Sequence, residues 1–168
     1  MMHEGAARKI IYDLKFSNKR DNADMLAYEA AKRCFELIRF WNPDVLIPVP
    51  LHRKKELARG FNQSFLLAKK LAYYLEIYDM NIPVDPDILV RCRQTLPMKE
   101  LSGAQRADNI KNAFAVASDA KAVSGRGFKY KTVLLVDDIY TTGATLSECA
   151  GVLKEAGAAA VYYLTFTM

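Results

Sequence analysis

The sequence has few cysteines, no long apolar run and no strong excess of charge, and each absence excludes a class of protein. Its three cysteines, Cys34, Cys92 and Cys149, are far apart and include no CxxC pair, which argues against a disulfide framework or a zinc site. The longest nearly apolar stretch, residues 156–166, is shorter than the ~18 residues that indicate a membrane span. The N-terminus lacks the continuous apolar region of a signal peptide. We therefore expect a reduced, cytoplasmic protein that makes no contact with a membrane.

The net charge of +5 comes from 24 Lys and Arg against 19 Asp and Glu. A modest basic excess suits anionic ligands in general, of which nucleic acid is only one. The sequence contains no RNP-like aromatic motif, zinc finger or helix-turn-helix signal. Direct nucleic-acid binding is therefore the weaker alternative, and polyphosphate recognition explains the charge equally well.

The length of 168 residues is enough for one well-buried domain and too short for two, so we expect a single domain over residues 1–168. Apolar segments of strand length alternate with segments of helical periodicity, which predicts an α/β fold with a parallel sheet flanked by helices. The expected helices are 24–41, 62–77 and one from 145 to Gly157; the expected strands are 44–50, 87–91, 131–136 and 159–165, with a further strand at 114–116 and a surface turn at 124–127.

Residues 133–145 are the most informative segment of the chain. Four apolar residues read as a buried strand, two carboxylates follow where that strand should end, and a hydroxyl-rich turn with one glycine leads into a helix. The free N–H groups of a helix N-terminus suit a phosphate monoester. Asp137 and Asp138 would repel a phosphate but accept hydrogen bonds from sugar hydroxyls, and they would stabilise positive charge on a ribose ring. The segment predicts a ribose 5-phosphate site, although a buried strand with an acidic pair and a capping turn is also common as plain structure.

Residues 133–145 resemble the phosphoribosyl pyrophosphate (PRPP) signature of type I phosphoribosyltransferases. The resemblance implies that Asp137 and Asp138, the catalytic residues, contact the ribose 2′ and 3′ hydroxyls. It also implies that a short loop wraps the 5-phosphate. The residues of that loop are Tyr140, Thr141, Thr142, Gly143, Ala144 and Thr145.

Residues 48–55 (PVPLHRKK) follow the first expected strand, and parallel strands place their carboxyl ends at one edge of the sheet. Cations and backbone N–H groups there suit a pyrophosphate, for which Leu51, His52 and Arg53 are the predicted ligands. Arg53 is preferred because a guanidinium holds phosphate oxygens bidentately. The alternatives are a solvated basic loop and, for His52, either a catalytic base or a structural residue.

The order PVPLHR, RGFNQ and VLLVDDIYTTGAT, together with IIYDLK at residues 10–15, resembles the ComF-type competence proteins, an amidophosphoribosyltransferase-like group. The resemblance implies a hood or flexible loop over residues 91–117 that closes over PRPP and excludes water. Its predicted lid residues are Arg91, Arg93, Thr95 and Arg106, each of which could instead be a solvated loop residue. Members of the group often begin with a small four-cysteine zinc module that this sequence does not contain, whether naturally or through trimming.

Two functions follow as expectations. The first is a Mg²⁺-dependent phosphoribosyltransferase that transfers the phosphoribosyl group from PRPP to an unidentified nitrogen acceptor, with Mg²⁺ carried by PRPP and met by Asp137 and Asp138 through water. The alternative is a non-catalytic sensor or accessory protein in DNA uptake or processing, which binds PRPP or a nucleotide. The resemblance also implies a homodimer and a DNA-uptake or helicase-type protein partner.

Overall fold

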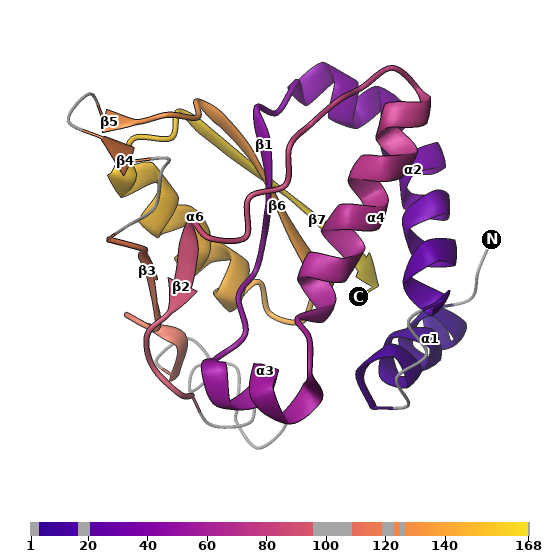
Figure 1. Ribbon diagram of the computed structural model, residues 1–168, viewed down its shortest axis with the longest axis horizontal. Helices are drawn as coiled ribbons and strands as arrows, with labels where there is room; N and C mark the ends of the chain where they lie inside the picture. The colour runs from indigo at the N-terminus through magenta and orange to yellow at the C-terminus, as the bar shows by residue number, and fades with distance from the viewer. Residues whose placement is uncertain (1–3, 17–20, 96–108, 119–122, 125–126, 168) are drawn as a thin grey trace.

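The computed structural model describes residues 4–16, 21–95, 109–118, 123–124 and 127–167 as a mixed α/β protein (Figure 1). The helices are α1 (Glu4–Phe16), α2 (Asp21–Trp41), α3 (Arg53–Arg59), α4 (Gln63–Ile77) and α6 (Ala144–Ala156). The strands are β1 (Val45–Pro48), β2 (Leu89–Arg91), β3 (Phe114–Val116), β4 (Val123–Ser124), β5 (Gly127–Phe128), β6 (Thr132–Ile139) and β7 (Ala160–Thr167). The expectation of an α/β fold with a helix-flanked parallel sheet is confirmed.

Three strands form the parallel sheet, in the order β1-β6-β7 with the long strand β6 in the centre. At the amino end of the sheet, the Asp44 carboxylate accepts hydrogen bonds of 2.8 Å from the backbone N–H groups of Lys131 and Thr132. These bonds fix the register, which pairs Pro48 with Val136 at the other end. The carboxyl ends of β1 and β6 therefore lie side by side, as the sequence predicts.

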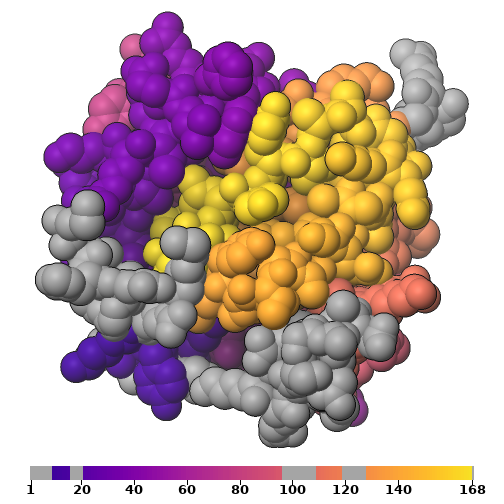
Figure 2. Space-filling view, turned by 180° about the vertical axis from the view of Figure 1, so that it is seen from behind, coloured from indigo at the N-terminus to yellow at the C-terminus, as the bar shows by residue number. Residues whose placement is uncertain are grey.

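Strands β1 and β6 are buried on both faces of the sheet, whereas β7 carries the exposed Tyr163. Successive side chains of a strand point to opposite faces. Ile47 and Leu135 belong to the core that includes α6, whereas Leu46 and Leu134 belong to the core that includes α1, α2 and α4. Figure 2 shows the molecule from behind, with the yellow C-terminal residues beside the purple residues of the N-terminal helices. Burial on both sides explains why residues 133–136 are apolar without alternation.

Helix α2 begins at Asp21, three residues before the predicted start. Asp21 and Asp24 lie in its first turn, where carboxylates stabilise the positive end of the helix dipole. Leu37 is exposed, and the buried face of this helix is built mostly from small residues. Its members are Ala23, Leu26, Ala27, Ala31 and Ile38. Alanines permit the close approach of α4, which packs alongside α2 (Figure 1).

The expected strand at 87–91 is present as β2, but it lies outside the parallel sheet. It pairs antiparallel with β3, so that Arg91 is opposite Phe114. This two-stranded sheet begins and ends the predicted hood, of which residues 96–108 lie outside the described residues. Two short antiparallel strands, β4 and β5, flank the position of the expected surface turn at 124–127, of which residues 125–126 lie outside the described residues.

Candidate functional site

The acidic pair lies inside the last residues of strand β6 and not after its end. Asp137 still pairs with Thr165 of β7. Neighbouring strand residues leave the backbone on opposite faces, but the two carboxylates remain close enough for the Asp138 charge to act on Asp137. Asp138 turns towards the face covered by α1, where it meets Lys15. Asp137 lies within electrostatic reach of Arg91 and Cys149, which belong to the other side of the sheet.

Asp137 is held by two hydrogen bonds to one of its carboxylate oxygens. Its Oδ1 accepts from the Ser64 hydroxyl and from the Asp138 backbone N–H, both at 2.9 Å. Burial raises the pKa of the Asp137 carboxyl, and the charge of the neighbouring Asp138 raises it further. A sugar hydroxyl donating to this carboxylate would offset part of that cost, because a hydrogen bond to the charged form favours ionisation.

Asp138 is almost fully buried and forms an ion pair with Lys15, the last basic residue of α1. The Lys15 Nζ lies 2.7 Å from Asp138 Oδ2, and the two side chains are 18% and 6% exposed. Neither Lys15 nor Ser64 was among the predicted site residues. The IIYDLK segment carried a family resemblance, but no local signal connected its lysine to a carboxylate more than a hundred residues away.

The loop after β6 has the conformation that the single glycine predicts. Gly143 has φ +76°, in the left-handed region, and is the N-cap of α6. Since it has no side chain, the Ala144 backbone N–H donates instead to the Thr142 hydroxyl at 3.5 Å. The Tyr140 ring lies across Gly143, so that a Cβ added there would be 2.7 Å from the Tyr140 hydroxyl oxygen. A small hollow opens here, lined by Asp137, Ile139, Tyr140, Thr141, Gly143, Thr145 and Leu146. The predicted phosphate loop and Asp137 therefore border one depression.

The predicted pyrophosphate residues connect β1 to α3. His52 caps this helix, since its Nδ1 accepts a hydrogen bond of 3.3 Å from the Lys54 backbone N–H. This contact gives His52 a structural role, which is one of the two alternatives that the sequence left open for it. Arg53 is the first residue of α3, with an exposed side chain. Leu51 is half-buried beside it.

The start of α4 connects the ends of β1 and β6. Asn62 caps α4 by accepting hydrogen bonds from the backbone N–H groups of Ser64 and Phe65 at 2.9 and 3.4 Å. Its amide also donates to the Val49 carbonyl at 3.1 Å. Arg59 donates to the Gln63 side chain. The RGFNQ segment thus holds the β1 loop in place and presents Ser64 to Asp137.

Two of the predicted lid residues are neighbours in the hood. Arg91 donates to the Thr95 hydroxyl, and its guanidinium lies 5.2 Å from the centre of the Phe114 ring. Burial lowers the pKa of Arg91, and its Nε has no hydrogen-bond partner among the described residues. Arg93 instead donates to the carbonyls of Asn109 and Lys111, at 3.0 and 2.8 Å, which fastens the two ends of the hood. Arg106 lies outside the described residues.

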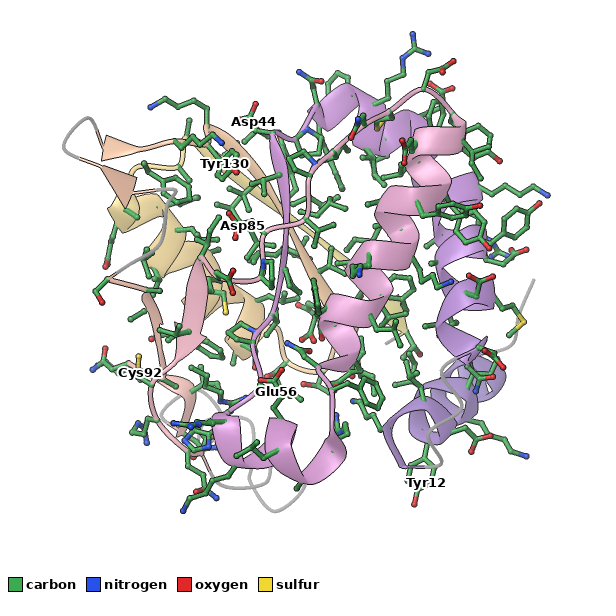
Figure 3. All side chains as sticks on the ribbon, in the orientation of Figure 1. Tyr12, Asp44, Glu56, Asp85, Cys92 and Tyr130 are labelled. Atoms are coloured by element: carbon green, nitrogen blue, oxygen red, sulfur yellow. The ribbon has the colours of Figure 1, made fainter. Side chains whose placement is uncertain are left out.

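A cavity of about 810 Å³ opens beside the predicted pyrophosphate loop. Its walls come from the end of β1, α3, the start of α4, and residues 85–91. Cations and carboxylates both line it: Arg53 and Arg91, with Glu56, Asp85 and Asp87. Figure 3 labels Glu56 on α3 and Asp85 near β1. Such a lining suits a polar molecule that both donates and accepts hydrogen bonds.

Comparison with known proteins gives relatives but no matching family model. The chain is 39% identical to competence protein F of Haemophilus influenzae over 132 residues, which cover 79% of this chain and 52% of that protein. It is 34% identical to DNA utilization protein YhgH of Escherichia coli K12 over 155 residues, 90% of this chain and 63% of the relative. Competence protein ComFC of Bacillus subtilis is 33% identical over 119 residues, 69% of this chain and 40% of the relative.

The relatives to which the chain is similar are named as competence proteins and DNA utilization proteins. The chain spans less than two thirds of the length of the relatives that it matches. Within the described residues, no helix is long and apolar enough to cross a membrane. The same residues contain no group of three or more His, Cys, Asp or Glu side chains placed to hold a metal ion.

Proposed function

We propose that this protein binds PRPP, or a similar ribose phosphate, as an accessory protein in DNA uptake or utilization. The observation that carries the proposal is the junction of β6 and α6, where Asp137 and the Gly143 loop border one hollow in front of the N-terminus of α6. Carboxylates there suit sugar hydroxyls, and the first-turn N–H groups of a helix, which lack intrahelical partners, suit a phosphate. The names of the relatives, competence proteins and DNA utilization proteins, support the cellular role.

We further propose that the domain has the type I phosphoribosyltransferase fold. In that case Mg²⁺ is the ion that we expect to bind together with PRPP. With one carboxylate already paired to Lys15, the protein offers few oxygen ligands of its own, which fits an ion carried by the ligand's phosphates. Asp137 and Asp138 are the residues that would face it, through water. The ion would supply positive charge against the pyrophosphate.

The binding proposal is tested by calorimetric titration with PRPP in the presence of Mg²⁺. We expect saturable binding by the unmodified protein, and its loss in the double variant Asp137→Asn, Asp138→Asn while circular dichroism and urea unfolding show a folded protein. Asparagine keeps the size and one acceptor oxygen of each side chain, so the variant isolates the charge. Unchanged affinity in the double variant would overturn the site assignment.

The second candidate function is catalysis of phosphoribosyl transfer, and the cavity beside Leu51 and Arg53 favours it. A nitrogen acceptor in that cavity would form a bond to C1 of the ribose as the C1–O bond breaks, and the electron pair would leave with pyrophosphate. The acceptor then loses its proton to water. The residues near the cavity contribute position and charge, and no protein nucleophile is needed.

Pyrophosphate release separates the two functions. The protein is incubated with Mg²⁺, PRPP and a panel of nucleobases and amines, and released pyrophosphate is measured by a coupled assay. Release that depends on an acceptor, and that is lost in the double aspartate variant, supports transfer. Saturable binding without release across the panel supports the accessory role.

A further inference from the structure

Helix α1 reaches the acidic pair, although it comes from the opposite end of the chain (Figure 1). Ile11 and Leu14 are fully buried and belong to the core that includes α2 and α4. They fix the last turn of α1, so that Lys15 projects over the carboxyl end of β6. The resulting ion pair with Asp138 is shielded from solvent, unlike the screened pairs of a protein surface.

The partners of the two carboxylates differ in charge. Asp137 accepts from a hydroxyl and a backbone N–H, both neutral. Asp138 faces the Lys15 ammonium at 2.7 Å. Arg59 is also within electrostatic reach of Asp138: burial lowers the pKa of Arg59, and the Asp138 charge opposes that shift. Lys15 therefore compensates one of the two negative charges directly.

We propose that Lys15 is a positioning residue that makes the acidic pair selective for sugar hydroxyls over a free divalent cation. Without Lys15, the two carboxylates would keep, among the described residues, only the charges of Arg59 and Arg91 within electrostatic reach, and such an acidic site attracts hard cations. The Lys15 ammonium removes one unit of negative charge and orients Asp138, while the remaining oxygens can still accept hydrogen bonds from neutral hydroxyls. The preference for sugar hydroxyls rests on the proposed function, whereas the effect of Lys15 on cation binding does not.

The selectivity is tested with Mn²⁺ alone, followed by electron paramagnetic resonance at about pH 8, which lies above the pKa of about 7 to which burial raises the Asp137 carboxyl. We expect weak binding by the unmodified protein and a gain of about tenfold in Lys15→Met and Lys15→Gln, because the pair regains its second charge. Lys15→Arg keeps the charge and should bind Mn²⁺ as the unmodified protein does. Glutamine is included because its amide can still donate to Asp138, which protects the fold.

Lys70→Met is the matched control. Lys70 forms an ion pair of the same 2.7 Å length with Asp24, between α4 and α2 and away from the acidic pair. Its loss tests whether removal of any lysine changes Mn²⁺ binding, and we expect no change. A Mn²⁺ affinity that stays unchanged in both Lys15→Met and Lys15→Gln, with both folded, would overturn the proposal.

Titration of the same variants with PRPP and Mg²⁺ completes the test. Affinity should fall about tenfold in Lys15→Met and stay within a few fold in Lys15→Arg, because the arginine keeps the counter-charge. Failure of the unmodified protein to bind PRPP would overturn the proposed function alone, since the Mn²⁺ experiment contains no sugar phosphate. A purely structural role for Lys15 would lower stability without raising Mn²⁺ affinity, and that result would overturn the inference.

Discussion

Substitution of Gly143 by alanine tests the loop between β6 and α6 most sharply, because Gly60 provides a matched control. Both glycines are in the left-handed region, at φ +76° and +82°. A Cβ at Gly60 would meet nothing within 4 Å, whereas a Cβ at Gly143 would lie 2.7 Å from the Tyr140 hydroxyl oxygen and 3.1 Å from the ring carbon that bears it. The two variants share the backbone strain and differ in the steric clash.

The expected magnitudes follow from that difference. The left-handed conformation costs a non-glycine residue about 1–2 kcal/mol, which Gly60→Ala should show alone. Gly143→Ala should lose a further ~1–3 kcal/mol, because the Tyr140 ring or the loop backbone must move to admit the methyl group. In a chain of this length each kcal/mol lowers the melting temperature by about 2–4 °C.

Urea unfolding measures the stabilities, and calorimetric titration with PRPP and Mg²⁺ measures binding by the folded variants. Gly143→Ala should bind at least about tenfold more weakly, a change of about 1.4 kcal/mol, because the displaced loop borders the predicted phosphate position. Adding Tyr140→Phe to Gly143→Ala should recover part of the lost stability by removing the nearest atom. Equal stability losses in Gly143→Ala and Gly60→Ala, or full affinity in Gly143→Ala, would refute this reasoning.

Two further predictions concern Asp137. Asp137→Asn alone should raise the free energy of unfolding at about pH 8, and this advantage should disappear towards about pH 4. Folding raises the pKa of the Asp137 carboxyl, so this group stabilises the folded protein only while it is protonated. Its contribution is lost as the pH rises through the raised pKa, whereas asparagine does not titrate. Urea unfolding across pH checks this, and an advantage that grows at low pH would contradict it. Ser64→Ala should weaken PRPP binding several-fold at neutral pH, because the lost hydrogen bond makes the Asp137 carboxyl harder to ionise. Calorimetric titration checks this prediction. Unchanged PRPP affinity would show that the ionisation of Asp137 does not depend on Ser64.

Features set by neighbouring residues could be predicted from the sequence. The apolar run before Asp137 predicted β6, and the glycine at position 143 predicted a left-handed turn before α6. Gly157 ends α6 in the left-handed conformation, as its position after the last periodic residue indicates. Asn62 caps α4 for the same local reason.

Features set by distant residues could not be predicted. Ser64 and Asp137 are 73 positions apart, and their contact depends on how α4 packs against the sheet. Lys15 reaches Asp138 only because buried residues of α1 fix the last turn of that helix over the end of β6. The pairing of β2 with β3 was missed because strand propensity carries no information about which sheet a short strand joins.

A crystal structure with PRPP and Mg²⁺ bound tests the central claim most directly. The account predicts the 5-phosphate on the backbone N–H groups of residues 141–145, the ribose hydroxyls at Asp137 and Asp138, and Lys15 still paired with Asp138. A ligand bound only in the cavity lined by Glu56 and Asp85, with no contact to Asp137 or Asp138, would contradict it.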